Sequence, residues 1–451
     1  MNMIKNSVIE KIKQNIIPIL PDRKQSMCRT YVCNKKKLTI LLFILFLFSF
    51  TSCVRKNTEN SENNTNGSYN EPENKTEQLV NTNEFSSIIS VTSEDGTYIL
   101  KMNNADGSYN IHYMDYKSNC DVYLCSSPNC SHDDLSCTSF IPANCGGVML
   151  AYNNEQLIEV ILGNKIDTPA QIYVMDKAGG NKKLIKTFSP EETVDFGYTI
   201  SYVLSDENIY LMTEKSCTEN GEVYMKNELI KVSLADGNTS VLMEMDSPTF
   251  FVGVRDNKIL MKELHGQINY IIEVDPVSGN KETIMQYNGG RILPFEYDNR
   301  LYMLDFERHS VYKNDEVDNP LVTFEFNGSN SLSGIRVLKN SRLIIDNSDI
   351  YFDNGNYITK NEKYCLDLSD GNLQSSSLTI DKNGKEALPW IYGMFGDKLL
   401  IDVGCHIEKK YGFNSQAGEM EEYESEIPDY GVITADNLFS NNLEYDTVTL
   451  N

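Results

Sequence analysis

The sequence is poor in basic charge. It holds 40 Lys and Arg against 64 Asp and Glu in 451 residues, a formal charge of −24. The imbalance is uneven, because residues 1–52 carry nine basic and two acidic residues, a net charge of +7. The remaining 31 basic and 62 acidic residues give the rest of the chain a net charge of −31. Such a surface repels the phosphates of nucleic acids, so we expect no nucleic-acid partner.

The spacings of the common catalytic motifs are also missing. No G-x-S-x-G, H-E-x-x-H or G-x-x-x-x-G-K-[ST] occurs, so the usual hydrolase, zincin and phosphate-loop mechanisms lack their residues. Cys405 and His406 are adjacent, but neighbouring strand residues face opposite ways, which spoils a nucleophile–base pair. We predict no catalytic residue. The only tryptophan, Trp390, is expected to be a buried anchor of the last repeat rather than a platform for sugars.

Long hydrophobic runs are scarce as well. Residues 38–50 (LTILLFILFLFSF) are thirteen mostly apolar residues, whereas a membrane-spanning helix needs about 20. The basic run Lys35-Lys36-Lys37 precedes them and Thr51-Ser52-Cys53 follows, an order typical of a secretory signal. The FTSC ending resembles a bacterial lipobox, which implies a lipidated Cys53 and an anchor on the outer face of the cell membrane. An ordinary signal peptide and an uncleaved anchor are the alternatives.

These features divide the chain into four parts. Residues 1–34 are an N-terminal extension that is cleaved, or of which residues 1–26 are not translated if translation starts at Met27. Residues 35–53 are the lipoprotein signal peptide. Residues 54–86 are rich in Asn, Glu, Thr and Ser. They bury too little apolar surface to offset the entropy of ordering, so we expect a disordered tether. Residues 87–451 are the folded domain.

A repeated motif organises the folded domain. In each copy a short run of strand-forming residues leads into a turn rich in Asp, Gly and Asn. The copies are IYVMDKAGGN (172–181), LIKVSLADGN (229–238), IIEVDPVSGN (271–280) and YCLDLSDGN (364–372). Their asparagines are 57, 42 and 92 residues apart, and 92 is twice 46. A period in the forties built of strands alone is typical of a β-propeller blade.

A second landmark, a polar turn followed by an apolar residue that starts a strand, supports this interpretation. The apolar residues are Tyr98, Leu157, Ile209, Ile259, Leu301, Ile350, Leu399 and Leu438. We predict an all-β propeller of seven blades, with six and eight as alternatives, in which the last unit completes the first blade. Ring closure removes exposed strand edges. A pair of β-sandwiches is the runner-up architecture.

Two segments resemble known proteins. The copy IYVMDKAGGNKKLI resembles the repeat of TolB-like propellers, in which a strand ends in Asp and a Gly-Asn turn leads into a basic strand. Residues 123–140 (YLCSSPNCSHDDLSCTSF) resemble a Cys-rich stretch of uncharacterised propeller-like lipoproteins of anaerobic Firmicutes. The second resemblance implies a cell-surface lipoprotein of unassigned activity.

Cysteines gather beside one histidine. The segment 120–145 holds Cys120, Cys125, Cys130, His132, Cys137 and Cys145. Exported proteins keep disulfides, so Cys125 could pair with Cys130, and Cys137 with Cys120 or Cys145. A zinc site made of Cys125, Cys130, His132 and Cys137 is the second interpretation, and reduced thiols are the third. In each case we expect a structural role in the first blade, and we predict no other cofactor.

Two functions from different classes remain. A binding module would hold a protein, peptide or glycan on the propeller, since repetition alone provides such a surface. A glycan-active enzyme, hydrolase or lyase, would place carboxylates at the central channel. The missing catalytic motifs and the tether favour the binding module.

Overall fold

The computed structural model describes residues 77–450, with gaps at 81–85, 88, 104–106, 144, 154–155, 196–199, 220, 289–290, 315, 317, 325–328, 338–340, 354–355 and 415–418. The extension, the signal segment and Cys53 lie outside the described residues. Within these residues, all elements but one short helix are strands. None of the described residues belongs to a helix long and apolar enough to cross a membrane.

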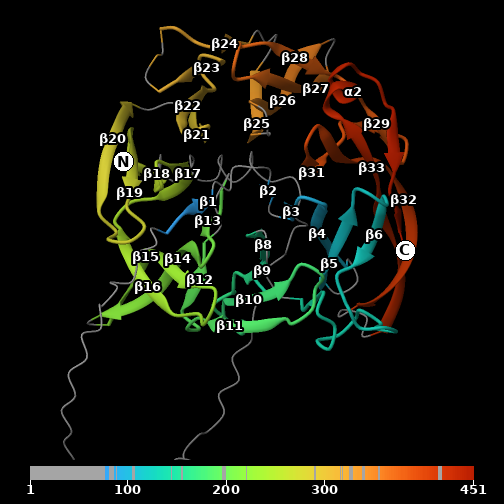
Figure 1. Ribbon diagram of the computed structural model, residues 1–451. Helices are drawn as coiled ribbons and strands as arrows, with labels where there is room; N and C mark the ends of the chain where they lie inside the picture. The colour runs from blue at the N-terminus through green and yellow to red at the C-terminus, as the bar shows by residue number, and fades with distance from the viewer. Residues whose placement is uncertain are drawn as a thin grey trace, which may run out of the picture. The chain divides into compact units, whose positions relative to one another are not determined.

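Most of the described strands form seven mainly antiparallel sheets, the blades of a propeller, arranged around a central axis (Figure 1). Blade 1 contains β2 (Ser86–Ser87), β3 (Ser90–Thr92), β4 (Gly96–Met102), β5 (Tyr109–Asp115) and β6 (Cys120–Tyr123), with β7 (Phe140–Ile141) beside β5. Blade 2 contains β8 (Val148–Tyr152), β9 (Gln156–Ile161), β10 (Gln171–Asp176) and β11 (Lys183–Thr187). Blade 3 contains β13 (Tyr202–Ser205), β14 (Asn208–Glu219), β15 (Glu222–Ser233) and β16 (Thr239–Met245), with β1 (Leu79–Val80) beside β13 and β12 (Glu192–Val194) beside β14.

The remaining blades follow the same order. Blade 4 contains β17 (Thr249–Arg255), β18 (Lys258–His265), β19 (Ile268–Val274) and β20 (Lys281–Asn288). Blade 5 contains β21 (Ile292–Tyr297), β22 (Arg300–Asp305), β23 (Ser310–Lys313) and β24 (Val322–Thr323). Blade 6 contains β25 (Ser329–Val337), β26 (Arg342–Asp353), β27 (Asn356–Asp367) and β28 (Leu373–Ser376), and a small hairpin of β29 (Ile380–Lys382) and β30 (Lys385–Ala387) follows it. Blade 7 contains β31 (Ile391–Phe395), β32 (Lys398–Asn414), β33 (Glu419–Thr434) and β34 (Tyr445–Thr447), with α2 (Ala435–Phe439) before β34.

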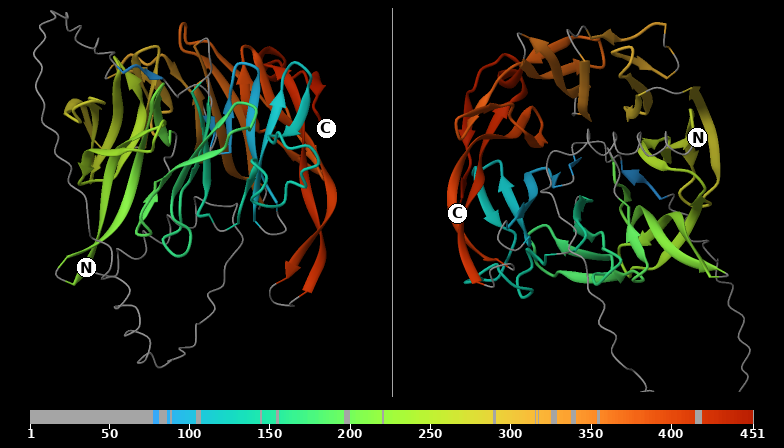
Figure 2. Two further views of the ribbon diagram at one scale, coloured as in Figure 1. Left: turned by 60° about the horizontal axis from the view of Figure 1, so that its bottom comes forward. Right: turned by 180° about the vertical axis from the view of Figure 1, so that it is seen from behind.

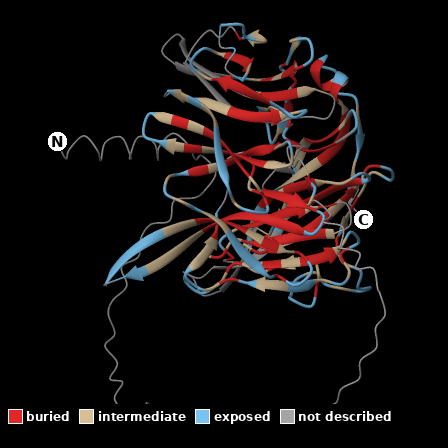
Figure 3. Ribbon diagram, turned by 60° about the vertical axis from the view of Figure 1, so that its left-hand side comes forward, coloured by how far each residue is buried: buried red, intermediate tan, exposed pale blue. Residues whose placement is uncertain are grey.

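The hydrophobic core lies between the blades. In the described part of the chain, seven clusters of buried side chains each join one blade to the next, and one of them joins blade 7 to blade 1. Neighbouring residues of one strand serve opposite interfaces: Leu399 packs toward blade 6, whereas Leu400 packs toward blade 1. The period of two along a strand therefore buries both faces of a blade. Figure 3 shows the buried residues along the strands and the exposed ones in turns and hairpin tips.

The repeated turns connect the third and fourth strands of blades 2, 3, 4 and 6, and they position neighbouring blades. Gly237 has a φ of +72°, and a Cβ added there would lie 1.9 Å from the carbonyl oxygen of Ile185 in blade 2. Gly279 meets Leu242 of blade 3 in the same way, since a Cβ at this glycine would lie 2.1 Å from the Leu242 carbonyl oxygen. The glycine of the motif is thus required twice, for the positive φ of the turn and for close backbone approach between blades.

The ring closes with the end of the chain. Strand β35 (Thr449–Leu450) pairs in parallel with β6, so that Thr449 lies opposite Cys120 and Leu450 opposite Asp121. The predicted completion of the first blade by the last unit is therefore confirmed, as is the count of seven blades.

Two of the predicted strand starts are wrong. Ile350 lies well inside β26, and Leu343, which is fully buried, occupies the position that Ile259 and Leu301 hold in their blades. Leu438 lies in α2, which Thr434 caps by accepting a hydrogen bond from the backbone N–H of Asn437. The apparent eighth unit is therefore no blade.

The predicted tether boundary at residue 86 is too late. Leu79–Val80 form β1 against Ser205 and Leu204 of β13, and the Glu77 carboxylate accepts a hydrogen bond from Ser205 at 2.6 Å. Glu77 also forms an ion pair with Lys231. The ordered chain therefore begins before residue 87.

Trp390 is not a buried anchor. It is 42% exposed just before β31, whereas the next two residues, Ile391 and Tyr392, are 1% and 8% exposed. The aliphatic and tyrosine side chains of β31 fill the interfaces in its place.

We expect Gly237→Ala to destabilise the protein more than Gly384→Ala. Both glycines have positive φ, +72° and +78°, but a Cβ at Gly384 meets nothing within 4 Å. The left-handed backbone alone costs about 1–2 kcal/mol in each variant. The clash with Ile185 should add about 1–3 kcal/mol in Gly237→Ala only. Urea unfolding of both variants measures the difference, and equal losses of stability would contradict the inter-blade role.

Candidate ligand pocket and cysteine–histidine cluster

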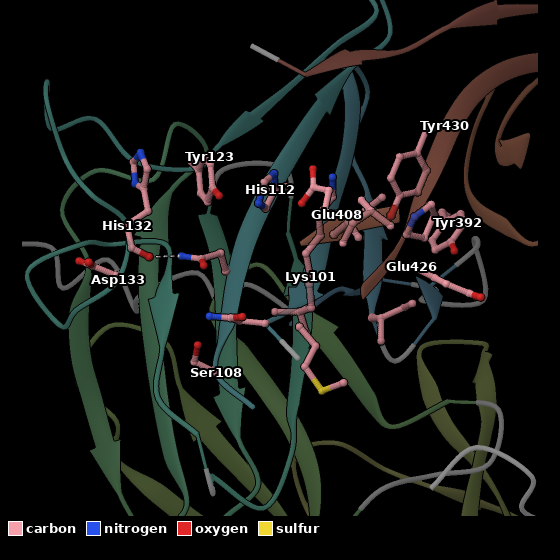
Figure 4. Close-up of a pocket in the computed structure, with 18 of the residues that line it drawn as sticks. Lys101, Ser108, His112, Tyr123, His132, Asp133, Tyr392, Glu408, Glu426 and Tyr430 are labelled. Carbon is pink, nitrogen blue, oxygen red and sulfur yellow. Dashed lines mark hydrogen bonds between the residues drawn. The ribbon is translucent and has the colours of Figure 1, made fainter. Parts of the chain in front are cut away.

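A pocket of about 650 Å³ lies where blade 1 meets blade 7. Its walls come from β4, β5 and β6 of blade 1, from residues 131–133 of the following loop, and from β31, β32 and β33 of blade 7. In Figure 4, His132 and Asp133 lie on one side, Tyr392, Tyr430 and Glu426 on the other, and Lys101 and His112 between them. The hairpin of β32 and β33 is long enough to reach past the neighbouring strands (Figure 2, red), and Glu408 and Glu426 of this hairpin line the pocket.

Two buried tyrosines form the apolar side of the pocket. The rings of Tyr392 and Tyr430 meet edge to face with centroids 5.1 Å apart. Lys101 Nζ lies 4.7 Å from the centre of the Tyr430 ring, a cation–π contact across the junction of the two blades. Burial raises the pKa of the Tyr430 hydroxyl well above its usual value. Tyr430 therefore remains a neutral hydrogen-bonding group at physiological pH.

A buried polar triad lies behind this side. Asp121 is 2% exposed, and its carboxylate forms an ion pair with Lys101. The same carboxylate forms a hydrogen bond with Nδ1 of His112 at 2.8 Å. Burial alone would raise the pKa of the Asp121 carboxyl, but the hydrogen bond from His112 and the charge of Lys101 hold it below its usual range. Burial lowers the pKa of His112, despite the opposing hydrogen bond to Asp121. The triad thus favours a carboxylate, an ammonium and a neutral imidazole.

A stack of three rings connects the triad to the Cys-rich loop. His112 and Tyr123 have ring centroids 4.2 Å apart, and Tyr123 and His132 stack at 4.1 Å with an interplanar angle of 5°. Asn110 Nδ2 donates a hydrogen bond to the carbonyl oxygen of His132 at 2.9 Å. The Tyr123 ring is therefore stacked on His132 and tilted by 44° against His112, so that both imidazole rings contact this tyrosine.

The loop between β6 and β7 brings the predicted cluster together. The ligand atoms of Cys125, Cys130, His132 and Cys137 all lie within 4.8 Å of one another. Cys137 is 2% exposed, and its sulfur lies 3.2 Å from His132 Nδ1. No disulfide joins cysteines of the described residues. Cys120 instead lies near Thr449 of β35, and Cys145 packs into the cluster between blades 1 and 2.

The thiols of the cluster differ in acidity. Burial tends to raise the pKa of Cys125, but the backbone N–H of Ser127 and the neighbouring thiols lower it to about 7. The backbone N–H of His132 lowers the pKa of Cys130. Desolvation and the neighbouring Cys137 and Cys125 side chains outweigh this effect and raise that pKa to about 11. Cys125 therefore becomes a thiolate, the form that binds metals, more readily than Cys130.

Carboxylates surround the pocket entrance. Glu426 accepts a hydrogen bond from Asn383 Nδ2 at 2.7 Å, and Asp133 accepts one from the hydroxyl of Ser131. Both donors, the amide of Asn383 and the hydroxyl of Ser131, are uncharged. Neither hydrogen bond therefore neutralises the charge of its carboxylate. Sequence reasoning missed the pocket, because its walls come from segments about 300 residues apart. The one sequence feature that could have indicated an acidic pocket entrance is the formal net charge of −24.

Comparisons with known proteins identify no sequence family. No family model matches the chain, and no curated protein matches it. Solved propellers are similar in structure, including an oligogalacturonate lyase in complex with manganese (13% identity, 76% of this chain, 83% of that chain, TM-score 0.37). TolB from Acinetobacter baumannii (12%, 76%, 77%, 0.30) and the β-propeller domain of the Trilobed protease from Pyrococcus furiosus (11%, 82%, 98%, 0.39) are similar too. The similarity is distant, and this propeller fold occurs in binding proteins and enzymes alike.

We expect the stability of the protein to fall as the pH drops below 6.5. Because burial lowers the pKa of His112 in the folded state, an imidazole of ordinary pKa 6.5 takes up its proton more readily in the unfolded chain. The contribution of neutral His112 is thus present above pH 6.5 and is lost as the pH falls through the lower, folded pKa. Thermal unfolding between pH 6.5 and 3.8 measures this loss, which should be smaller in His112→Gln. His265→Gln, whose parent side chain is 46% exposed, is the control, and identical pH profiles of wild type and His112→Gln would contradict the prediction.

Proposed function

We propose that this protein is a binding module that holds a peptide through a positively charged group in the pocket between blades 1 and 7. The observation that supports the proposal most strongly is the pocket itself. Its volume of about 650 Å³ lies within the range of small-molecule sites, roughly 300–1,000 Å³. Buried tyrosines form one side, and Asp133, Glu408 and Glu426 provide negative charge. The two lysines of the lining, Lys101 and Lys409, already form ion pairs with Asp121 and Glu422. A lysine side chain or an amino terminus matches this arrangement.

Long-range electrostatics support a cationic ligand. The chain has a formal charge of −24, and the part beyond residue 52 carries −31. Such a charge attracts cations and repels anionic polymers, so it accelerates encounters with basic peptides. A peptide is favoured over a neutral glycan because the Tyr123 ring is already stacked on His132 and the Tyr430 ring is in contact with Lys101.

The alternative is a glycan-active enzyme with carboxylates at the central channel. Two of the buried carboxylates have lysine partners: Glu159 lies 2.8 Å from Lys182, and Asp402 forms an ion pair with Lys382. Burial raises the pKa of both carboxyl groups, and the lysines oppose that rise. Ion pairs of this kind stabilise the fold, which favours the binding module over the glycan-active enzyme. Release of reducing ends from an oligosaccharide would favour the enzyme.

The setting of this module is the second part of the proposal. The basic run, the apolar core and the polar segment after Cys53 support a lipoprotein anchored to the outer face of the cell membrane. A polar segment of this length would hold the propeller away from the lipid surface.

We expect Glu426→Gln to weaken binding of a fluorescein-labelled pentalysine peptide by about three- to tenfold, which corresponds to about 0.7–1.4 kcal/mol. The substitution removes one carboxylate from the entrance and keeps the shape of the side chain. Glu424→Gln is the matched control, because Glu424 is an exposed residue of the same strand that lies outside the pocket lining. Fluorescence anisotropy with the full-length chain in non-ionic detergent gives the affinities, and added salt should weaken binding.

Three results would count against a cationic peptide as the ligand. Pentaserine could bind as tightly as pentalysine, the two glutamine variants could lose equal affinity, or wild type could bind neither peptide.

Lipidation has a separate test. Cells that express the full-length chain are grown with an alkyne analogue of palmitate, and the protein is then coupled to a fluorophore. Wild type should carry label and Cys53→Ala should not, because the thiol of Cys53 is the proposed site of diacylglycerol attachment. Cys217→Ala, a change on β14, is the control and should be labelled like wild type. Equal labelling of all three would overturn the anchor.

A further inference from the structure

The Cys-rich loop has the geometry of a metal site. Tetrahedral zinc binds sulfur at about 2.3 Å and nitrogen at about 2.0–2.1 Å, so its ligand atoms lie about 3.5–3.8 Å from one another. The ligand atoms of Cys125, Cys130, His132 and Cys137 already lie within 4.8 Å of one another. Small adjustments of side chains would bring all four to bonding distance. Nothing in the repeat requires such a gathering, because the other blades have no such loop in their described residues.

The position of the imidazole separates a metal from a disulfide. Three cysteines allow one disulfide and leave one thiol over, and neither arrangement uses the histidine. Yet His132 Nδ1 lies 3.2 Å from Cys137 Sγ, with its ring held flat against Tyr123. The backbone of His132 has a φ of +60°, which a non-glycine residue rarely adopts. The loop thus turns the imidazole nitrogen toward the sulfurs.

Neighbouring groups hold the loop in place. The hydroxyl of Ser139 lies 3.0 Å from the sulfur of Cys137, and Thr138 Oγ1 donates a hydrogen bond to the carbonyl oxygen of Leu124 at 3.2 Å. Asn110 of β5 holds the carbonyl of His132. Contacts of this kind orient the ligands of structural metal sites.

We propose that Cys125, Cys130, His132 and Cys137 bind one zinc ion as a closed, structural site. Three thiolates and one imidazole fill the four positions of a tetrahedral ion and leave none for a substrate. Sulfur-rich tetrahedral sets favour zinc over calcium, magnesium or manganese, which prefer oxygen. On binding, the three thiols release their protons to solvent as the metal–sulfur bonds form. The site does not depend on what the pocket binds.

The ion would also shape one wall of the pocket. Ser131, His132 and Asp133 line the pocket, and they lie between the ligands Cys130 and Cys137. A metal that ties these ligands together fixes the segment between them. The zinc site would therefore position the Asp133 carboxylate at the pocket entrance.

The test uses the full-length chain in detergent, purified with a reducing agent and without chelator. Elemental analysis should find about one zinc per chain. Replacement by Co²⁺ should give the intense visible bands of a tetrahedral ion and the near-ultraviolet absorption of thiolate-to-cobalt charge transfer. In competition with a chromophoric chelator, Cys130→Ser and His132→Gln should bind zinc at least about tenfold more weakly than wild type. Cys217→Ser, on β14 of another blade, should bind like wild type.

Cys130 is preferred to the buried Cys137 as the variant, because it is partly exposed and its loss should leave the fold intact, as circular dichroism will show. The proposal is overturned by a disulfide within the cluster in mass spectrometry of a second sample, purified without reducing agent. It is also overturned by weak octahedral cobalt bands, by a bound metal other than zinc, or by zinc affinity that Cys130→Ser and His132→Gln leave unchanged.

Discussion

The packing of each blade against both of its neighbours is the constraint on which the rest of the structure depends. Adjacent residues such as Leu399 and Leu400 pack into opposite interfaces, so an inner strand such as β32 buries both of its faces between blades. The turn glycines complete the arrangement, since Gly237 and Gly279 let one blade touch the backbone of the previous one. A blade alone would expose two apolar faces. Each blade is therefore stable only within the ring.

The pocket and the cysteine–histidine cluster both occur where this regular packing is modified. At the junction of blades 7 and 1, the long β32–β33 hairpin and the loop after β6 extend beyond the strands that fill the interface. The buried ion pair of Lys101 and Asp121 lies beneath them, with the His112 imidazole against the carboxylate. The apolar side chains between blades 7 and 1 hold the junction together. The β32–β33 hairpin and the loop after β6 add the polar residues of the pocket and of the cysteine–histidine cluster.

Local sequence predicted much of the fold and little of the pocket. The turns at Asn181, Asn238, Asn280 and Asn372 obey rules of φ and hydrogen bonding that act within ten residues, and all four fall where the motif places them. The cysteine cluster was visible because its members lie within one loop. Ile350 and Leu438 misled because a polar turn before an apolar residue also describes the middle of a long strand and the cap of a helix. The pocket stayed hidden, since Lys101 and Glu426 meet only when the ring closes.

The parallel pairing of β35 with β6 has a consequence for the order of folding. Cys120 and Thr449 are 329 residues apart, so the contact between them spans most of the 451-residue chain. Contacts of such separation form late, and a chain that leaves the ribosome or an export channel amino end first makes its closing strand last. Blade 1 keeps this edge of β6 unpaired until residues 449–450 have been made. The blade 7 wall of the pocket, which includes Tyr430, likewise meets the blade 1 wall only after the intervening blades have been made.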